Sequence, residues 1–177
     1  MYKRFGKRLI DILLSACGII VLSPVLLILV IAIKLDSPGP VLFKQKRVGL
    51  HKTHFNILKF RTMRIPEESF DKDGKPLESK QRITKAGKFL RKTSLDELPQ
   101  LFNILLGQMS LVGPRPERPH FVEKFKEDIP RYMVKHQVRP GLTGWAQING
   151  YRGDTSIRKR IEYDIYYKEN KSCDTYR

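Results

Sequence analysis

The sequence is poor in cysteine, histidine and tryptophan. Of its 177 residues, only two are cysteine, four are histidine and one is tryptophan. Two cysteines are too few for the disulfide framework of a small secreted domain, and Cys17 lies inside a long apolar run, where a bridge to Cys173 is not expected. A reducing, cytoplasmic setting is therefore indicated. The histidines lack the spacing of metal ligands, which argues against a zinc site.

Familiar nucleotide-binding motifs are also missing. The sequence has neither a Walker loop nor a dinucleotide fingerprint, and no Ser-His-Asp order stands out. Hydrophobic residues make up 41% of the chain, which is enough for a core and excludes a chain that is disordered throughout. Because the sequence contains a single long apolar run, a multi-spanning membrane protein is excluded as well.

Basic residues are present in large excess. The chain has 34 Lys and Arg against 18 Asp and Glu, a net charge of +16. Residues 41–92 contribute +10 of this, with 15 basic and 5 acidic side chains. Such a surplus predicts nucleic acid, an acidic membrane surface or phosphorylated substrates as partners, and the simpler alternative is a solvated basic surface. Its place directly after the apolar run favours lipid head groups or phosphorylated ligands at a bilayer.

The apolar run extends from Ile12 to Ile33, which is 22 residues without a charge. That length is sufficient for a helix that crosses a membrane. A cleaved signal peptide has a shorter apolar region followed by small residues, whereas Lys34 and Asp36 follow here. We therefore expect a retained membrane anchor.

Two features favour a re-entrant helix over a simple membrane span. Ser23 and Pro24 lie in the middle of the run, where proline removes a backbone donor and is expected to break the helix. Cations flank the run on both sides: Lys3, Arg4, Lys7 and Arg8 before it, and Lys34, Lys44, Lys46 and Arg47 after it. Loops rich in Lys and Arg tend to stay cytoplasmic, so a helix that enters and leaves on one face satisfies both flanks. An ordinary single span is the alternative.

The rest of the chain predicts a short β-hairpin followed by helices. Residues 41–48 and 53–61 read as two strands around a turn, with Phe55, Ile57 and Lys59 on one face. Residues 65–82 are polar and predict a surface loop. Helical patterns follow at residues 85–92, 95–106, 119–128, 130–137 and 156–168. The fold class expected is α+β and predominantly helical, with a re-entrant membrane helix at residues 1–36 and a compact cytosolic helical domain at residues 37–177.

The helix expected at residues 95–106 has clear boundary signals. Ser94 is a candidate N-cap with Glu97 three residues later, and Gly107 closes the far end. The apolar residues that recur at helical spacing, and that we expect in the core, are Leu95, Leu98, Leu101, Phe102 and Leu105.

Two adjacent carboxylates, Asp96 and Glu97, lie in the first turn of this helix. As part of a capping box their role would be structural. Alternatively, two such carboxylates divide the work of catalysis, one attacking and the other holding a divalent cation. Cations upstream, Arg91 among them, favour catalysis, because a bound phosphate would meet both a guanidinium and the helix N–H groups.

Further candidate phosphate ligands lie elsewhere in the chain. Lys59 and Arg61, on the second expected strand, could supply additional phosphate contacts. The loop of Pro114, Arg115 and Pro116 is rigid, which suits presentation of a guanidinium to a phosphate or a base. A purely structural turn is the alternative for this loop.

Several long stretches of the sequence resemble one known family. FKQKRVG, the KFRTM of Lys59–Met63, TKAGKFLRKTSLDELPQLFNIL, SLVGPRPE and RPGLTGWAQINGYRGDT occur in this order. Together they resemble the bacterial sugar transferases, monotopic polyprenyl-phosphate hexose-1-phosphate transferases that start exopolysaccharide, O-antigen or glycoprotein glycan synthesis. The resemblance covers nearly the whole chain. The stretch NGYRGDT is most similar to members that handle glucose or galactose.

The resemblance implies an activity and a set of site residues. The activity is transfer of a sugar 1-phosphate from a UDP-sugar to undecaprenyl phosphate, with release of UMP and with Mg²⁺ as cofactor. Asp96 would be the nucleophile, forming a phosphosugar-aspartyl intermediate, and Glu97 would assist, the two carboxylates being the metal ligands. Arg91 would contact a substrate phosphate. The uridine nucleotide would bind at Pro114, Arg115 and Pro116, and the re-entrant helix would break at Ser23 and Pro24.

The resemblance also implies a location and leaves alternatives open. We expect the bacterial inner membrane, with the catalytic domain on the cytoplasmic face and anionic lipids as further partners; a homo-oligomer is left open. The chain resembles the catalytic part of larger members, and because the residues after Tyr167 depart from the family pattern, we expect a truncated C-terminal end. An inactive interaction protein of the same family is therefore an alternative, whereas nucleic-acid binding has only charge in its favour. The identity of the sugar stays open, as does direct attack by the lipid phosphate with Asp96 acting only electrostatically.

Overall fold

The computed structural model describes residues 2–65, 78, 81–153 and 155–171 of the chain. Its contacts divide the chain into two compact units that alternate along the sequence. Unit 1 comprises Met1–Gly18, Gln45–Ile57 and Gln100–Arg177, and unit 2 comprises Ile19–Lys44 and Leu58–Pro99. The expected boundary at residue 36 divides a part of the chain in the membrane from a part in water. The two units are defined by contacts within the protein, so they do not test this boundary, and it stays a prediction.

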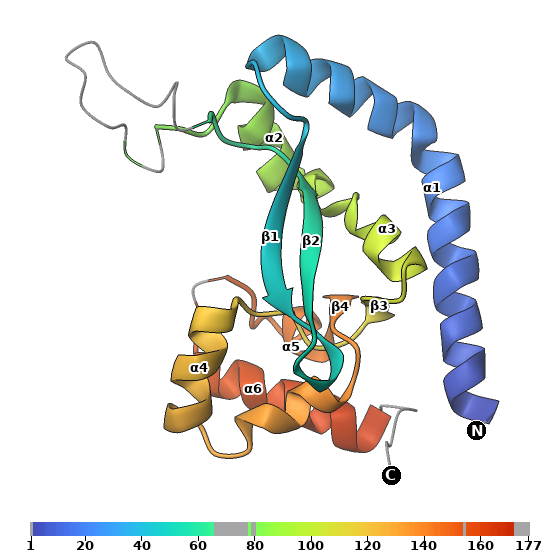
Figure 1. Cartoon of the computed structure of the whole chain (residues 1–177), viewed down its shortest axis with the longest axis vertical. Helices are drawn as coiled ribbons and strands as arrows, with labels where there is room; N and C mark the ends of the chain where they lie inside the picture. The colour runs from blue at the N-terminus through green and yellow to red at the C-terminus, as the bar shows by residue number, and fades with distance from the viewer. Residues whose placement is uncertain (1, 66–77, 79–80, 154, 172–177) are drawn as a thin grey trace. The chain divides into compact units, whose positions relative to one another are not determined.

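The elements are a long N-terminal helix, a hairpin, and a series of short helices and strands (Figure 1). In chain order they are α1 (Tyr2–Asp36), β1 (Leu42–Val48), η1 (Leu50–Lys52), β2 (His54–Phe60), α2 (Lys85–Thr93), η3 (Leu95–Glu97), α3 (Gln100–Leu105), β3 (Ser110–Val112), α4 (Pro119–Asp128), η4 (Tyr132–Gln137), β4 (Gly141–Thr143), α5 (Trp145–Ile148), α6 (Ile157–Tyr166) and η5 (Tyr167–Lys171). The predominantly helical α+β fold class is confirmed. Most of the polar loop expected at residues 65–82 lies outside the described residues.

The hairpin forms where the alternating pattern predicts it. β1 and β2 pair across the turn η1, and the bonds Gly49 N–H to Thr53 O (2.7 Å) and Arg61 N–H to Val41 O (2.8 Å) mark an antiparallel register. Phe55 and Ile57 are buried, as expected for one face of β2. Lys59 continues this face, which decides where its ammonium group lies in the candidate site.

The helix expected at residues 95–106 is divided in two, and the predicted capping box is wrong. Ser94 adopts a left-handed conformation with φ 59°, ends α2, and makes no side-chain capping bond. A tight 3-10 turn, η3, follows, and regular helix starts only at Gln100. Because η3 shifts the helical register, Phe102 is exposed while Asn103 and Ile104 are buried. Gly107, with φ +80°, ends α3 as predicted.

Helix α1 is continuous through Ser23 and Pro24. Pro24 has no N–H to donate to the carbonyl of Ile20, four residues earlier, and such a loss weakens a helix. The hydroxyl of Ser23 donates to that same carbonyl oxygen at 2.7 Å and replaces the missing donor. The helix is therefore not interrupted at Ser23 and Pro24. The re-entrant path through a bilayer stays a prediction.

Among the described residues, one helix, α1, is long enough and apolar enough to cross a membrane. Many of its large apolar side chains are exposed, for example Ile20, Val21, Leu27 and Ile28. Such a continuous apolar surface is rare on a soluble monomer and marks a membrane or protein contact.

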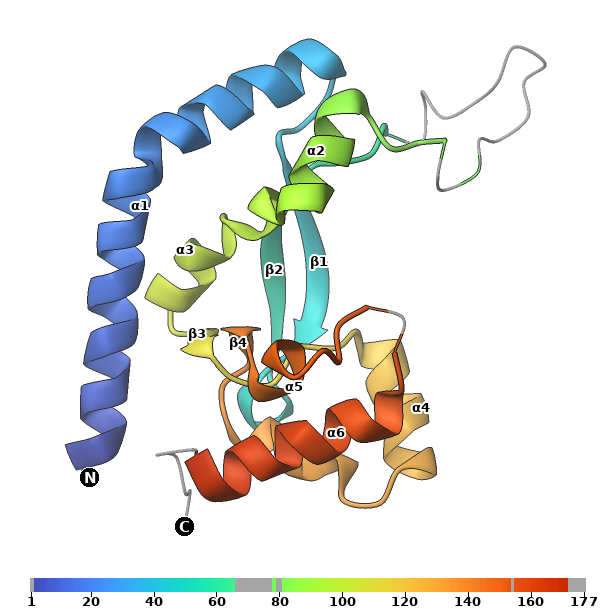
Figure 2. The ribbon, with the colours of Figure 1, turned by 180° about the vertical axis from the view of Figure 1, so that it is seen from behind.

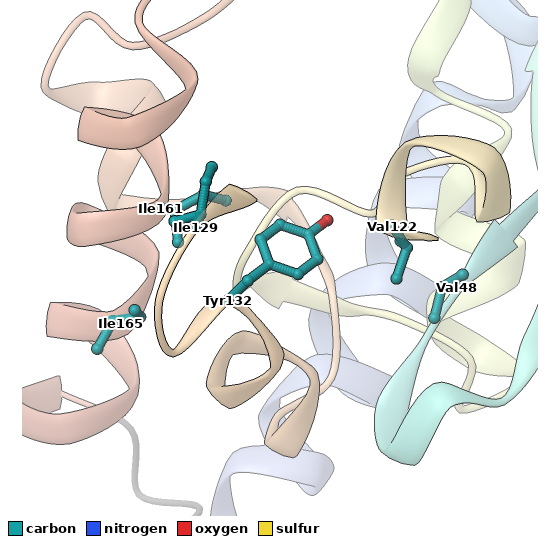
Figure 3. Close-up of a cluster of buried hydrophobic side chains, with 6 residues drawn as sticks. All are labelled: Val48, Val122, Ile129, Tyr132, Ile161 and Ile165. Carbon is teal, nitrogen blue, oxygen red and sulfur yellow. The ribbon is translucent and has the colours of Figure 1, made fainter. Parts of the chain in front are cut away.

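The core of unit 1 lies between α4, η4, α6 and the end of β1. Figure 3 shows its buried side chains, with the ring of Tyr132 between those of α6 and those of Val48 and Val122. The full cluster is Val48, Val122, Ile129, Tyr132, Ile161 and Ile165. In the view of Figure 2, α6 lies beside the short helix α5, where Trp145 stacks on Tyr166 with ring centroids 6.0 Å apart.

A two-stranded parallel sheet in unit 1 was not predicted. β3 pairs with β4, with Ser110 opposite Gly141 and Val112 opposite Thr143. Each strand has only three residues, which is too short for a recognisable alternating pattern. The strands approach closely at Gly113, because a Cβ there would lie 2.3 Å from the carbonyl oxygen of Arg139. This sheet holds the start of the Pro114–Arg115–Pro116 loop.

The core of unit 2 joins the second half of α1 to β2 and α2. Its buried side chains are Leu29 and Ile33 of α1, Phe60 of β2 and Leu90 of α2. Asp36, at the end of α1, accepts a hydrogen bond from the backbone N–H of Ala86 (2.8 Å) in the first turn of α2. These contacts fix α2, the helix that leads directly to the two carboxylates.

Candidate active site

The two carboxylates lie in the turn η3, directly after α2. The left-handed Ser94 ends α2, and the N–H groups of Glu97 and Leu98 donate to the carbonyls of Ser94 and Leu95. Glu97 is buried and Asp96 is partly exposed. The tight turn therefore presents the two neighbouring carboxylates in different environments, which is the arrangement needed for a division of roles.

Glu97 is held by a lysine from the strand β2. The Nζ of Lys59 lies 2.7 Å from Oε1 of Glu97, and both side chains are largely buried. The paired ammonium group offsets much of the free-energy cost of burying the Glu97 carboxylate. The sequence predicted a phosphate contact for Lys59. In the structure its ammonium group pairs with Glu97, and the phosphate contact stays a prediction.

Asp96 is harder to ionise than an ordinary aspartate. Burial raises its pKa above the ordinary value of 3.8, and the negative charge of Glu97 adds to the rise. The positive charges of Lys59 and Arg91 lower the pKa and so oppose these effects. A partly desolvated carboxylate among cations is a stronger nucleophile than one in water, provided that it is ionised.

Arg91 lies on α2, one helical turn before η3, and its side chain reaches back to Thr62. The Nε of Arg91 donates to Oγ1 of Thr62 at 2.9 Å. Its charge is close enough to Asp96 to lower the pKa of that carboxyl. Sequence reasoning missed Thr62, although it lies within the KFRTM stretch that carries the family resemblance.

Arg61 has a structural role in this structure, and its expected contact with a substrate phosphate stays a prediction. Its side chain is buried, and its guanidinium donates to the carbonyl oxygens of Ser37, at 2.6 Å, and Pro38. β2 ends at Phe60, so the strand pattern that places Lys59 no longer applies to Arg61. The guanidinium instead secures the turn that follows α1.

Replacing Arg61 by methionine is expected to lower the free energy of unfolding by about 2–3 kcal/mol, because one buried and one partly buried hydrogen bond from a charged group are lost. Denaturant unfolding of the purified protein measures this. Arg64→Met, at an exposed side chain, is the matched control and should change stability little. An Arg61→Met variant that is as stable as wild type but binds phosphate more weakly would show that Arg61 is a phosphate ligand.

The Pro114–Arg115–Pro116 loop lies in unit 1, whereas the carboxylates lie in unit 2. The Pro114 carbonyl accepts a hydrogen bond from Gly141 N–H (2.9 Å), and the Pro116 carbonyl accepts one from Arg47 Nη1 (3.1 Å). The next residue, Glu117, is buried and pairs with Arg160 of α6 at 3.4 Å. The backbone on both sides of Arg115 is thereby fixed, as the rigid-loop prediction requires.

A small cavity borders this loop and is lined by Val48, Gly49, Pro114, Arg115, Pro116, Lys135, His136, Val138 and Pro140. Burial lowers the pKa of His136 to about 4, so its imidazole is neutral at neutral pH. Lys135 also lines the cavity, but its ammonium group pairs with Asp164 at 2.9 Å. Arg115 is the cationic group that the loop itself brings to this cavity.

A metal would have few protein ligands here. Among the residues that the structure describes, no group of three or more His, Cys, Asp or Glu side chains could hold a metal ion. Mg²⁺ bound to nucleotides needs only one or two carboxylates, because phosphate oxygens and water supply the other ligands. Asp96 and Glu97 fit that requirement, and a metal held by protein ligands alone does not fit.

Comparison with known proteins identifies the family. The sequence profile of the family described as "Bacterial sugar transferase" matches residues 2–175. The chain belongs to this family. Its membership agrees with the order of the five motifs noted in the sequence.

Several curated relatives in the bacterial sugar transferase family have named activities. The chain is 49% identical over 165 residues to the UDP-glucose:undecaprenyl-phosphate glucose-1-phosphate transferase of Klebsiella pneumoniae, covering 91% of this chain and 35% of that protein. It is 48% identical over 174 residues to the UDP-N-acetylgalactosamine-undecaprenyl-phosphate N-acetylgalactosaminephosphotransferase of Aeromonas hydrophila, covering 95% and 40%. It is 44% identical to the exopolysaccharide production protein PSS of Rhizobium leguminosarum bv. phaseoli, covering 94% and 86%. The chain thus spans little more than a third of the length of the first two relatives.

Proposed function

We propose that this chain transfers a sugar 1-phosphate from a UDP-sugar to undecaprenyl phosphate and releases UMP, as the first membrane step of exopolysaccharide, O-antigen or glycan synthesis. The observation that supports this most directly is the pair Asp96 and Glu97 beside Lys59 and Arg91, in a chain similar to enzymes named for this reaction.

Asp96 is the nucleophile in the proposed reaction. One carboxylate oxygen attacks the phosphorus that bears the sugar, the bond from that phosphorus to the bridging oxygen of the diphosphate breaks, and UMP leaves with the electron pair. A phosphate oxygen of undecaprenyl phosphate then attacks the same phosphorus, and the bond to Asp96 breaks. The products are undecaprenyl diphosphate-sugar and the free carboxylate.

The neighbouring charges make this attack feasible. A carboxylate that approaches a diphosphate is repelled, and cations held in place beforehand reduce that repulsion in the transition state. Arg91 would bind a phosphate oxygen, while Lys59 neutralises Glu97 and so limits the negative charge next to Asp96. Arg115 would bind the uridine nucleotide in the fixed loop.

Mg²⁺ is the proposed cofactor. Asp96 and Glu97 would hold it together with the diphosphate oxygens of the substrate. When bound, it supplies positive charge that stabilises the departing UMP.

The location proposed is the bacterial inner membrane, with the catalytic residues on the cytoplasmic face and anionic lipids beside the basic segment. The exposed apolar side chains of α1 and the cations on both of its flanks support this. Undecaprenyl phosphate stays in the bilayer, so the phosphosugar on Asp96 that its phosphate attacks must lie near the head groups.

A single cysteine placed at Lys7 or at Lys46, in a background without Cys17 and Cys173, is expected to react with an impermeant thiol reagent from the cytoplasmic side in both cases. Both flanks of α1 are basic, and basic flanks remain cytoplasmic. Labelling of intact cells and of inverted vesicles measures this. Labelling from opposite sides would mean that α1 spans the membrane.

Release of UMP by membranes that contain the protein tests the proposed function. UDP-glucose, UDP-galactose and UDP-N-acetylgalactosamine are compared, each with undecaprenyl phosphate, because the names of the relatives include both glucose and N-acetylgalactosamine. Release of many UMP molecules per protein with one of these sugars, dependent on the lipid and on Mg²⁺, is expected. Absence of release from folded protein with every sugar would favour an inactive interaction protein of the same family.

The fall of kcat/KM on the acid side is expected at a pH above 3.8, the pKa of an ordinary aspartate. Only ionised Asp96 attacks phosphorus, and burial raises its pKa, so activity is lost as pH falls through this raised value. Lys59→Met removes a charge that lowers the pKa and should move this fall to still higher pH, whereas Lys59→Arg should keep it near the wild-type position. UMP release measured as a function of pH checks both. An unshifted fall in Lys59→Met would contradict this electrostatic account.

A further inference from the structure

Thr62 makes a hydrogen bond to Arg91 that ties two separate parts of unit 2 together. Its Oγ1 accepts from the Nε of Arg91 at 2.9 Å, across 29 residues of sequence. Thr62 is buried, whereas Arg91 is exposed. The hydroxyl is therefore the fixed partner, and the guanidinium is the group whose orientation it restricts.

The backbone around Thr62 is rigidly held against the start of α2. The carbonyl of Thr62 accepts from Thr84 N–H at 3.1 Å, and Met63 forms an antiparallel bridge with Ile83. Thr84 then caps α2, its hydroxyl accepting from Gly87 N–H at 3.0 Å. α2 passes so close that a Cβ on Gly87 would lie 2.1 Å from the Thr62 carbonyl oxygen, so only glycine fits there. The distance from Thr62 to Arg91 is thus set by backbone contacts.

The hydrogen bond to Thr62 is made by the Nε edge of the Arg91 guanidinium and does not involve the edge formed by the two terminal nitrogens. Within the described part of the chain, Nε is the one Arg91 nitrogen for which a hydrogen bond is found. The two terminal nitrogens are the pair that binds a phosphate in a bidentate manner. Arg91 also lies on α2 one helical turn before η3, the turn that carries Asp96.

We propose that Thr62 is a positioning residue, which fixes the guanidinium of Arg91 so that its two terminal nitrogens bind a diphosphate oxygen pair next to Asp96. This inference rests on the proposed function for the nature of the substrate. A flexible arginine loses side-chain entropy when it binds, and one whose Nε is already bonded loses less.

Thr62→Val and Thr62→Ser test this role. Valine keeps the branched shape without the hydroxyl, and serine keeps the hydroxyl. Calorimetric titration of the full-length protein with UDP should show affinity about five- to tenfold weaker for Thr62→Val, and within about twofold of wild type for Thr62→Ser. Thr93→Val, which removes an exposed hydroxyl bonded to the Phe89 carbonyl at the end of α2, is the matched control and should bind UDP as wild type does.

A double-mutant cycle separates positioning from a general loss of structure. If Thr62 acts through the guanidinium, Thr62→Val should weaken UDP binding little further in an Arg91→Ala background.

The results that would overturn the positioning role of Thr62 can be told apart from those that would overturn the proposed function. Equal losses from Thr62→Val with and without Arg91, or no rescue by serine, would overturn the positioning role. If wild type binds UDP but turns over no UDP-sugar, the proposed function fails while the binding comparison still decides the role of Thr62. A wild-type protein that does not bind UDP would overturn both.

Discussion

Asp96→Asn is expected to reduce UMP release by at least about 10³-fold, because a neutral amide cannot replace an attacking carboxylate. The shape of the side chain is retained, while one accepting carboxylate oxygen becomes an NH2 group that donates. The charge next to Glu97 is removed, so folding should not suffer. The loss should therefore lie in kcat, with UDP affinity largely kept.

The covalent step gives the same variant a second and more specific readout. Wild-type protein incubated with the UDP-sugar but without lipid should gain the mass of one sugar phosphate, measured on the intact chain. Asp96→Asn should gain nothing. The control is Asp128→Asn, at an exposed carboxylate at the end of α4, which should form the adduct as wild type does.

Two results would change the mechanism. A fully active Asp96→Asn protein would exclude Asp96 as the nucleophile. An inactive Asp96→Asn, combined with a wild-type protein that never carries the adduct although it turns over, would favour direct attack by the lipid phosphate with Asp96 acting electrostatically.

Asp164→Leu is expected to lower the free energy of unfolding by about 3–5 kcal/mol, since it leaves a buried ammonium group without a partner. Asp164 of α6 lies 2.9 Å from Nζ of Lys135 in η4, and the two side chains are only 2% and 1% exposed. The pair lies beside the core of unit 1, next to Ile161 and Ile165 on the same helix. Water therefore cannot replace the lost partner.

Denaturant unfolding followed by the fluorescence of the single Trp145 measures the effect, because this residue stacks on Tyr166 of α6. The double variant Lys135→Met with Asp164→Leu should recover most of the stability, because no charge then remains buried. Glu169→Leu removes the exposed ion pair with Arg131 and should change stability by about 0–1 kcal/mol. Equal losses for Asp164→Leu and Glu169→Leu would contradict the role of burial.

Local patterns in the sequence predicted the elements that depend on local interactions. Alternation predicted the hairpin, and helical spacing predicted α2, α4 and α6. The division of the 95–106 helix was not predictable in this way, because Ser94 is left-handed only as the end of α2. β3 and β4 were missed because their pairing joins short segments that are 31 residues apart, as Ser110 and Gly141 are.

The candidate site shows the same division between local and long-range information. The adjacent carboxylates, Arg91 and the proline-arginine loop are visible as sequence. The roles of Lys59 and Arg61 are not, since both are cations two residues apart that follow the same pattern. One pairs with Glu97 and the other binds the carbonyls of Ser37 and Pro38, because β2 ends between them.

By itself, the sequence determined the family, the basic charge, the long apolar helix and the residue types that the chemistry needs. The tertiary structure decided which cations meet a carboxylate, which secure the backbone, and that Thr62 restrains Arg91. The physical reason is that charge and hydrogen-bonding capacity are properties of a residue, whereas Coulomb energies and desolvation depend on distance and burial. Those are set by contacts such as the one between Lys59 and Glu97, which are 38 residues apart in the chain.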